Sequence, residues 1–229
     1  PVALTMGDPA GVGVEIVIKA WIRREAHHLP PFYLIADPIH VQMTAQRLIE
    51  FDFRLRDVPA IAEIKHPSEV EHYFDQALPV YPLPLVRKVH PGHLNKANAP
   101  AVVKSIEQAV AHVFDGMASS LVTNPIQKSV LYESGFAYPG HTEFLGEICG
   151  SDHHPVMMLS CPGLKAVPVT IHMPLRDAVS SLTTEMIVKR ASIAASAMSI
   201  PDSFLPLAGK LVLPLLAFSY LLIPHFFSK

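Results

Sequence analysis

The chain has 229 residues, of which 50% are hydrophobic and 17% are charged, and its formal net charge at pH 7 is -2. Such a chain can bury a sizeable core as one large or two small domains, and its balanced charge argues against nucleic-acid partners. Two cysteines, Cys149 and Cys161, are too few for a disulfide framework, so we expect a reduced, cytoplasmic protein.

The first third of the chain predicts alternating strands and helices. An apolar run at 2–6 fits a buried strand, and a glycine-rich turn then leads into a helix that ends near residue 25. A second buried strand is predicted at 32–37. Asp37 and Pro38 then fit the N-cap and the first position of a helix to about residue 48.

The middle of the chain is less regular. Prolines interrupt the segment 61–91, which predicts only edge strands and loops. Apolar residues recur at helical spacing over 99–117, so this segment predicts an amphipathic helix. A strand that ends at Thr123 follows, and a short helix is expected to begin near Pro125 or Ile126.

The last elements are a helix, a hairpin and another helix. A helix is expected to start at His141, with Thr142 as a candidate cap. Two strands are predicted within 155–172, paired about Pro162–Gly163, so that His172 follows directly after the second. A helix capped by Thr183 or Thr184 is expected next.

This order of elements predicts an α/β fold with a largely parallel sheet. Ligands of such folds bind at the carboxyl ends of the strands. The predicted elements place three segments there: the loop 7–13, the loop 124–128 and the residues after Ile171.

Two of these loops have both a functional and a purely structural interpretation. The loop 7–13, "GDPAGVG", is either an anion-binding turn before a helix or simply a tight turn, and Asp8 is either a helix cap or a ligand contact. It matches neither the dinucleotide fingerprint nor the P-loop. Asn124 and Lys128 follow a strand. Lys128 is either a point charge for a phosphate or carboxylate, or a solvated side chain.

Two candidate histidines, His141 and His172, are also open to two interpretations. His141 is either a site residue or a structural imidazole. His172 is a candidate metal ligand or general base, and otherwise a surface residue.

Four long motifs together resemble one enzyme family, the 4-hydroxythreonine-4-phosphate dehydrogenases of pyridoxal phosphate biosynthesis. They are "ALTMGDPAGVGVEI", "LVTNPIQKSV", "GFAYPGHTEFLGE" and "TIHMPLRD", in this order, and the resemblance extends from Val2 to about Met198. It implies a two-domain α/β fold like that of isocitrate and isopropylmalate dehydrogenases. It also implies a homodimer with the site at the subunit interface.

The resemblance further implies a reaction and its residues. The family oxidises 4-phosphooxy-L-threonine with NAD or NADP, and decarboxylation then gives 3-amino-2-oxopropyl phosphate. Three histidines hold a divalent cation such as Zn, Mg or Co. His141 and Thr142 match the substrate-binding pair, and His172 matches the first metal ligand. Asp8, Asn124 and Lys128 match cleft-lining segments.

The sequence departs from the family near Ile200. The family's later motifs, Asn-Pro-His-Ala-Gly-Glu and Tyr-His-Asp-Gln, do not occur, and residues 201–229 form an apolar tail. We therefore expect residues 1–200 to be the N-terminal part of the fold, with an incomplete second domain. A frameshift or truncation is our preferred interpretation of the tail, over a membrane-associated segment that prolines interrupt.

These departures leave four functions open. The first is the family's dehydrogenase, and we hypothesise that the chain as it stands has little or no activity. The second is a dehydrogenase of 4-phosphorylated threonate or erythronate, which shares these motifs. The third is a non-catalytic remnant, and the fourth is a membrane-anchored binding protein, although we expect no membrane partner.

Overall fold

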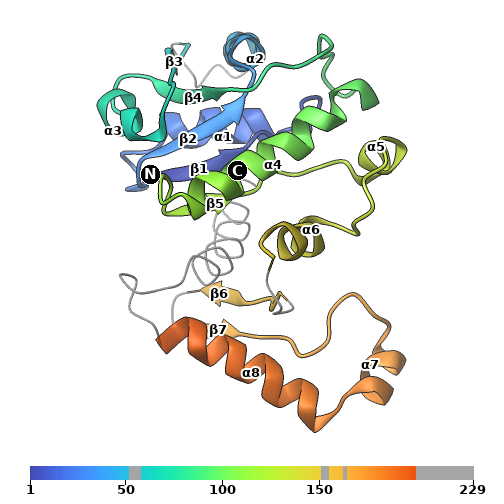
Figure 1. The fold of residues 1–229 in the computed structure, drawn as a ribbon. Coiled ribbons are helices and arrows are strands. Elements are labelled where there is room, and N and C mark those ends of the chain that lie inside the picture. The colour runs from blue at the N-terminus through green and yellow to red at the C-terminus, as the bar shows by residue number, and fades with distance from the viewer. Residues whose placement is uncertain (52–57, 151–154, 162–163, 200–229) are drawn as a thin grey trace. The chain divides into compact units, whose positions relative to one another are not determined.

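A computed structural model describes residues 1–51, 58–150, 155–161 and 164–199 (Figure 1). It divides the chain into two compact units, Pro1–Ile148 and Cys149–Lys229. The apolar tail 201–229 lies outside the described residues. In the part of the chain that is described, no helix is long and apolar enough to cross a membrane.

The first unit is built on a five-stranded sheet with the order β3-β4-β2-β1-β5. Every neighbouring pair is parallel, which confirms the predicted α/β class with a parallel sheet. Because a parallel sheet is covered on both faces, its central strands are buried throughout, as β2 is. The strands are β1 Val2–Thr5, β2 Phe32–Ala36, β3 Ile61–Glu63, β4 Leu78–Pro82 and β5 Ser120–Val122.

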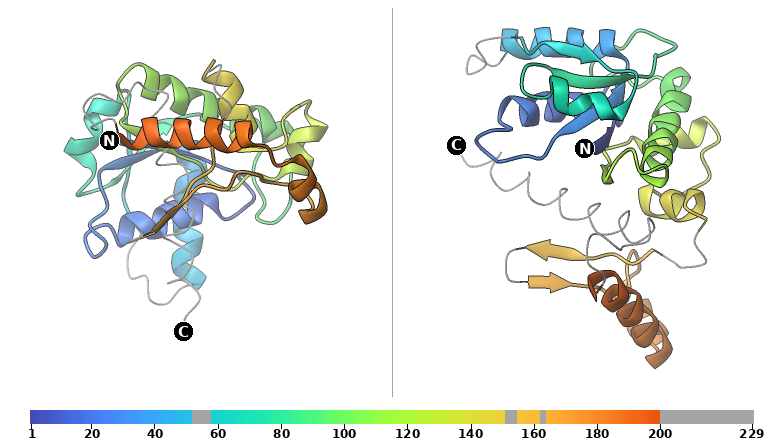
Figure 2. Two further views of the ribbon diagram at one scale, coloured as in Figure 1. Left: turned by 90° about the horizontal axis from the view of Figure 1, so that it is seen from below. Right: turned by 60° about the vertical axis from the view of Figure 1, so that its left-hand side comes forward.

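Helices cover both faces of this sheet. α1 and α2 contact each other, whereas α4 packs against β1, β2 and β5. Figures 1 and 2 show α4 and α1 on opposite sides of the strands. The helices of this unit are α1 Gly13–Ile22, α2 Pro38–Phe51, η1 Pro67–Glu69, α3 Val70–Tyr73, η2 Lys96–Asn98, α4 Ala99–Phe114, α5 Lys128–Glu133 and α6 His141–Ile148.

The start of α2 confirms its predicted cap. Asp37 Oδ1 accepts hydrogen bonds from the N–H groups of Ile39 (2.9 Å) and His40 (3.2 Å), and Pro38 is the first helical residue. Proline is suited to this position because its missing N–H has no helical partner there.

The prediction for segment 61–91 was wrong in two respects. β4 is an interior strand between β3 and β2, and the short helices η1 and α3 precede it. Pro79 and Pro82 remove two N–H donors from β4, but Leu78 and Val80 are completely buried. This burial offsets the lost donors in a strand of only five residues.

Polar side chains of α4 connect it to the sheet. Ser105 Oγ accepts from the Met6 N–H (2.9 Å) and donates to the Ile35 carbonyl (2.8 Å). Two turns further along α4, His112 Nδ1 lies 2.8 Å from Tyr33 Oη, and His112 Nε2 lies 2.9 Å from Gln108 Nε2. With the Gln108 amide donating to Nε2, Nδ1 keeps its proton and donates to Tyr33.

This arrangement predicts acid sensitivity of the first unit. Burial lowers the pKa of His112 below its usual 6.5, so the folded state binds fewer protons than the unfolded state at mildly acidic pH. Stability should therefore fall as pH decreases below about 6.5, by at most about 1.4 kcal/mol per pH unit for one group. Urea unfolding followed by the fluorescence of Trp21, the only tryptophan, measures this.

A His112→Gln variant is the matched control, since it keeps hydrogen-bonding capacity without a titrating group. Its stability should decline less between pH 7 and pH 5 than that of the unchanged chain. Parallel pH profiles would contradict the assignment to His112, because buried His40, whose pKa burial also lowers, would then account for the slope.

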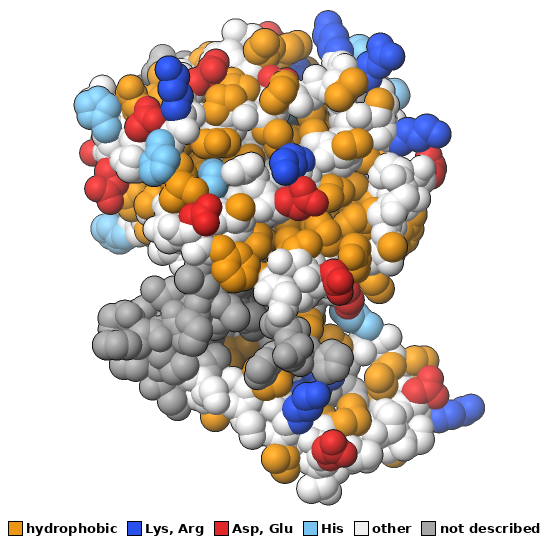
Figure 3. Space-filling view, in the orientation of Figure 1, with side chains coloured by type: hydrophobic (Ala, Val, Ile, Leu, Met, Phe, Trp, Pro, Cys, Tyr) orange, Lys and Arg blue, Asp and Glu red, His pale blue; other side chains and the backbone are white. Residues whose placement is uncertain are grey.

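The second unit contains a hairpin and two helices: β6 Leu159–Cys161, β7 Leu164–Ala166, α7 Leu175–Ser181 and α8 Thr184–Ser199. The antiparallel pairing of β6 with β7 confirms the predicted hairpin. Thr183 Oγ1 accepts from the Met186 N–H (3.2 Å), which confirms the predicted cap. Hydrophobic side chains are exposed on this unit (Figure 3), among them Leu164, Leu175, Val179 and Val188.

The predicted strand before His172 was wrong. β7 ends at Ala166 and belongs to a separate two-stranded sheet, so His172 follows a bend and no strand of the parallel sheet leads into it. Pro168 lacks an N–H, which prevents the pairing with β6 from continuing. α7 begins immediately after Pro174 and was not predicted.

Candidate functional site

The first unit has a topological switch point between β1 and β5. The chain leaves β1 through α1 on one face to reach β2, and it reaches β5 through α4 on the other face. The loops after β1 and β5 therefore diverge at neighbouring carboxyl ends, where open α/β sheets bind ligands. The predicted convergence of the loops 7–13 and 124–128 is confirmed.

Asn124 joins these two loops. Its backbone N–H donates to Thr5 Oγ1 (3.0 Å) and its Nδ2 donates to the Thr5 carbonyl (2.7 Å). Next to it, the Asp8 N–H donates to the Pro125 carbonyl (2.9 Å). Because Asn124 is buried and both donors bind β1, its main visible role is to hold the strand ends together.

The glycines at the ends of the loop are required by packing inside the protein. Gly7 has a φ of +68°, and a Cβ there would lie 2.7 Å from the Pro125 carbonyl oxygen. A Cβ at Gly13 would lie 2.7 Å from the Met6 carbonyl oxygen and 3.0 Å from Asn124 Cβ. These contacts favour the structural interpretation of Gly7 and Gly13.

Asp8 is not the cap of α1. Its Oδ1 accepts from the Ala10 N–H (2.8 Å) within the loop, and the N-cap of α1 is Val12, which has no side-chain bond. Asp8 lines a small pocket, but its expected place in the substrate cleft stays a prediction. Four polar side chains of this pocket were not predicted as site residues: His93, Asn95, Asn98 and Gln127.

A second group of residues lies where α5 and α6 begin. α5 packs its Val130 and Leu131 against Ala99 and Val102 of α4. Three aromatic rings then fix the loop between α5 and α6, with centroids 5.0–5.3 Å apart: Phe136, Tyr138 and Phe144. Packing of this kind holds the start of α6 near the start of α5.

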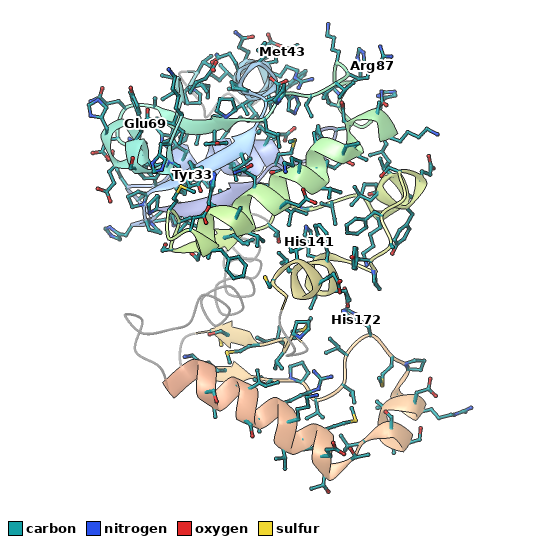
Figure 4. All side chains as sticks on the ribbon, in the orientation of Figure 1. Tyr33, Met43, Glu69, Arg87, His141 and His172 are labelled. Carbon is teal, nitrogen blue, oxygen red and sulfur yellow. The ribbon has the colours of Figure 1, made fainter. Side chains whose placement is uncertain are left out.

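His141 is the first residue of α6 (Figure 4). Its Nε2 is buried and has no hydrogen-bond partner among the described residues. Burial, with a smaller contribution from the Lys128 ammonium, lowers the pKa of His141 to about 4. The imidazole is therefore neutral at physiological pH, and its Nε2 is available to a ligand.

Lys128 and Glu143 lie beside the residue that precedes His141. A methyl group added at Gly140 would be 3.6 Å from Lys128 Nζ and 3.5 Å from Glu143 Oε2. The structure thus brings together Lys128 and His141, which the family resemblance placed in one cleft. Glu143 was missed, because an acidic residue in the first turn of a helix is most often there to interact with the helix dipole.

Thr142 lies inside the first turn of α6, so the prediction that it caps this helix was wrong. Gly140 precedes the helix, and its carbonyl accepts from the Phe144 N–H (3.2 Å). The expected role of Thr142 in substrate binding stays a prediction.

His172 belongs to the second unit, where its side chain is exposed and its φ is +56° (Figure 4). This left-handed conformation is uncommon for a residue with a Cβ, and His28 in the first unit also adopts it, with a φ of +50°. In the described part of the chain, no three His, Cys, Asp or Glu side chains form a group that can hold a metal ion. His172 alone is fewer ligands than a metal site needs, so its expected role as a metal ligand stays a prediction.

Known proteins resemble the chain over most of its length. The family described as "Pyridoxal phosphate biosynthetic protein PdxA" matches residues 29–201. A 4-hydroxythreonine-4-phosphate dehydrogenase from Zymomonas mobilis is 40% identical over 91% of this chain and 60% of the relative. One from Bradyrhizobium diazoefficiens is 46% identical over 86% of this chain and 58% of its own.

Solved structures agree with this similarity. The crystal structure of a 4-hydroxythreonine-4-phosphate dehydrogenase from Burkholderia phymatum matches with a TM-score of 0.75 and 26% identity, over 86% of this chain and 58% of that chain. The chain thus spans about three fifths of the length of the relatives that it matches.

Proposed function

The chain belongs to the PdxA family of pyridoxal phosphate biosynthetic proteins, and on that premise we propose that it contributes the substrate-binding part of a 4-hydroxythreonine-4-phosphate dehydrogenase. The proposed reaction is the oxidation of 4-phosphooxy-L-threonine, with decarboxylation to 3-amino-2-oxopropyl phosphate. The family is one of dehydrogenases, which implies a nicotinamide cofactor, NAD or NADP, as the hydride acceptor.

The observation that supports this proposal most directly is the unpartnered Nε2 of His141. A buried polar atom without a partner costs about 1–3 kcal/mol, and a substrate that bonds to Nε2 would remove this cost. Because the pKa of His141 is about 4, the imidazole meets the substrate as a neutral hydrogen-bonding group. His141 and Thr142 are the proposed substrate contacts.

We also propose the family's architecture for this chain. It is a two-domain fold like that of isocitrate dehydrogenase, a homodimer and a cytoplasmic enzyme, with His172 as one ligand of a divalent cation such as Zn, Mg or Co. The two later histidine motifs of the family do not occur in the sequence, so little turnover is expected from this chain by itself.

Binding of 4-phosphooxy-L-threonine to the 229-residue chain, measured by isothermal titration calorimetry, tests the proposal. We expect saturable binding that His141→Ala weakens by about tenfold or more, because a desolvated hydrogen bond to the substrate is lost. His27→Ala, an exposed histidine beyond the end of α1, is the matched control and should bind normally. An absence of binding to the unchanged chain would refute the proposed function.

The second candidate substrate is 4-phospho-threonate or 4-phospho-erythronate, which the same motifs fit. Titration of both hydroxy acids under identical conditions decides between the two activities. Preference for a hydroxy acid over 4-phosphooxy-L-threonine would assign the chain to sugar-acid catabolism. Formation of NADH or NADPH at the rate of the Zymomonas mobilis relative would contradict the expected weak turnover.

A further inference from the structure

The space beside Gly140 lies between two opposite charges. Lys128 Nζ and Cε are each 3.6 Å from the position of a Cβ on Gly140, and Glu143 Oε2 is 3.5 Å from the same position. Within the described residues, Lys128 forms neither a hydrogen bond nor an ion pair with any side chain. The ammonium therefore faces this space with its donors available.

Glycine at position 140 is not explained by the backbone. Its φ lies outside the left-handed region, in contrast to Gly7, and the nearest atoms around a Cβ would be at ordinary van der Waals distance. The residue is nevertheless buried. The absence of a side chain thus serves to leave room beside the Lys128 ammonium.

His141 adds a third polar group at the same place. It follows Gly140 directly in the chain, and its buried Nε2 needs a partner that no described residue supplies. Lys128 and His141 come from different helices, α5 and α6, which the aromatic rings of Phe136 and Phe144 hold together. In the tautomer with the proton on Nε2, His141 and the Lys128 ammonium can both donate hydrogen bonds to a small anionic group of a ligand.

Building on the proposed function, we propose that Lys128 is a substrate-binding residue, which together with His141 binds one anionic group of the substrate in the space beside Gly140. The group is a phosphate or a carboxylate, both of which accept hydrogen bonds from an ammonium and an imidazole N–H. Lys128 is itself exposed, so its proposed role depends on its position beside Gly140 and His141 and not on burial.

Glu143 faces the same space and opposes an anion there. Its carboxylate repels a bound phosphate, so the affinity reflects a balance between Lys128 and Glu143. The two side chains should consequently have opposite effects on anion binding when their charges are removed. This opposition separates a site beside Gly140 from any other basic patch on the protein.

The test is a calorimetric titration of the 229-residue chain with inorganic phosphate at low ionic strength. Lys128→Met should weaken binding about tenfold, because a charge-assisted hydrogen bond is lost, and Lys128→Arg should bind within about twofold of the unchanged chain. Lys65→Met is the matched control. Lys65 follows β3, at the edge of the sheet opposite β5, and is exposed.

Two further variants examine the position of the anion. Glu143→Gln should tighten phosphate binding about threefold, and Gly140→Ala should weaken it while thermal unfolding stays nearly unchanged. Equal binding by Lys128→Met and the unchanged chain would overturn the proposal, as would weaker binding by Glu143→Gln. Circular dichroism shows whether each variant is folded.

A parallel titration with malonate identifies the group. Binding of phosphate in preference to malonate assigns Lys128 to a phosphate, the reverse assigns it to a carboxylate, and binding of neither anion refutes the site.

NMR titration of His141 is a second, independent measurement. The pKa of His141 should rise in Lys128→Met, because the ammonium that lowers it is removed. If phosphate binds as expected but 4-phosphooxy-L-threonine does not, the proposed function fails while the anion site remains.

Discussion

Replacing Gly7 with alanine should lower the free energy of unfolding of the first unit by about 3 kcal/mol or more. Two costs add: an L-residue with a φ of +68° is strained by about 1–2 kcal/mol, and the new Cβ would lie 2.7–2.8 Å from Pro125 and Asn124. Neither neighbour can move easily, because the contacts are a backbone oxygen and a Cβ. Urea unfolding followed by Trp21 fluorescence measures the loss.

Gly116→Ala is the matched control for this experiment. Gly116 has almost the same φ, +70°, but a Cβ there meets no atom within 4 Å. It should therefore cost only the strain of the backbone, about 1–2 kcal/mol. If the two substitutions destabilised the protein equally, the close approach of the loops after β1 and β5 would be wrong.

Asn124→Asp is expected to lower the free energy of unfolding by about 3 kcal/mol at pH 7, although it replaces only the side-chain nitrogen with an oxygen. The Asn124 Nδ2 donates to the Thr5 carbonyl at 2.7 Å, and an aspartate would place an unpaired, buried negative charge against that oxygen. Burial would raise the pKa of the new carboxyl, so the loss should shrink as pH falls through that raised value. Urea unfolding at pH 7 and pH 4.5 checks both.

Asn95→Asp makes the same chemical change where the oxygen, instead of the nitrogen, is bonded. Asn95 Oδ1 accepts from the Ala97 N–H (3.0 Å) at the start of η2, and the side chain is exposed. A carboxylate serves this position equally well, so stability should change by less than about 0.5 kcal/mol. A comparable loss at both positions would show that the Asn124 amide bond contributes little.

Local chemistry allowed most elements of the first unit to be predicted. The cap formed by Asp37 depends on neighbours two and three residues away, and the strand at 32–36 is a continuous apolar run, so both are visible in the sequence. β4 was misplaced at an edge because its prolines are local signals. The burial of Leu78 and Val80 that outweighs them depends on the assembled sheet.

The candidate site was predictable only in part. Motif resemblance placed His141 and Lys128 in one cleft, but not directly beside Gly140, because that proximity depends on the packing of Phe136, Tyr138 and Phe144. The burial that lowers the pKa of His141 has no signal in the sequence for the same reason. For His172, an apolar run suggested a strand, whereas Pro168 ends the pairing before it.

The bonds between Thr5 and Asn124 also bear on the order of events during synthesis. The two residues are separated by 119 positions, and β1, the first strand of the chain, has β5 as one of its two neighbours in the sheet. Until β5 has left the ribosome, β1 has an unpaired edge that can pair with another chain. The switch point therefore forms late, and a nascent chain that pauses before residue 120 should depend on chaperones to avoid aggregation.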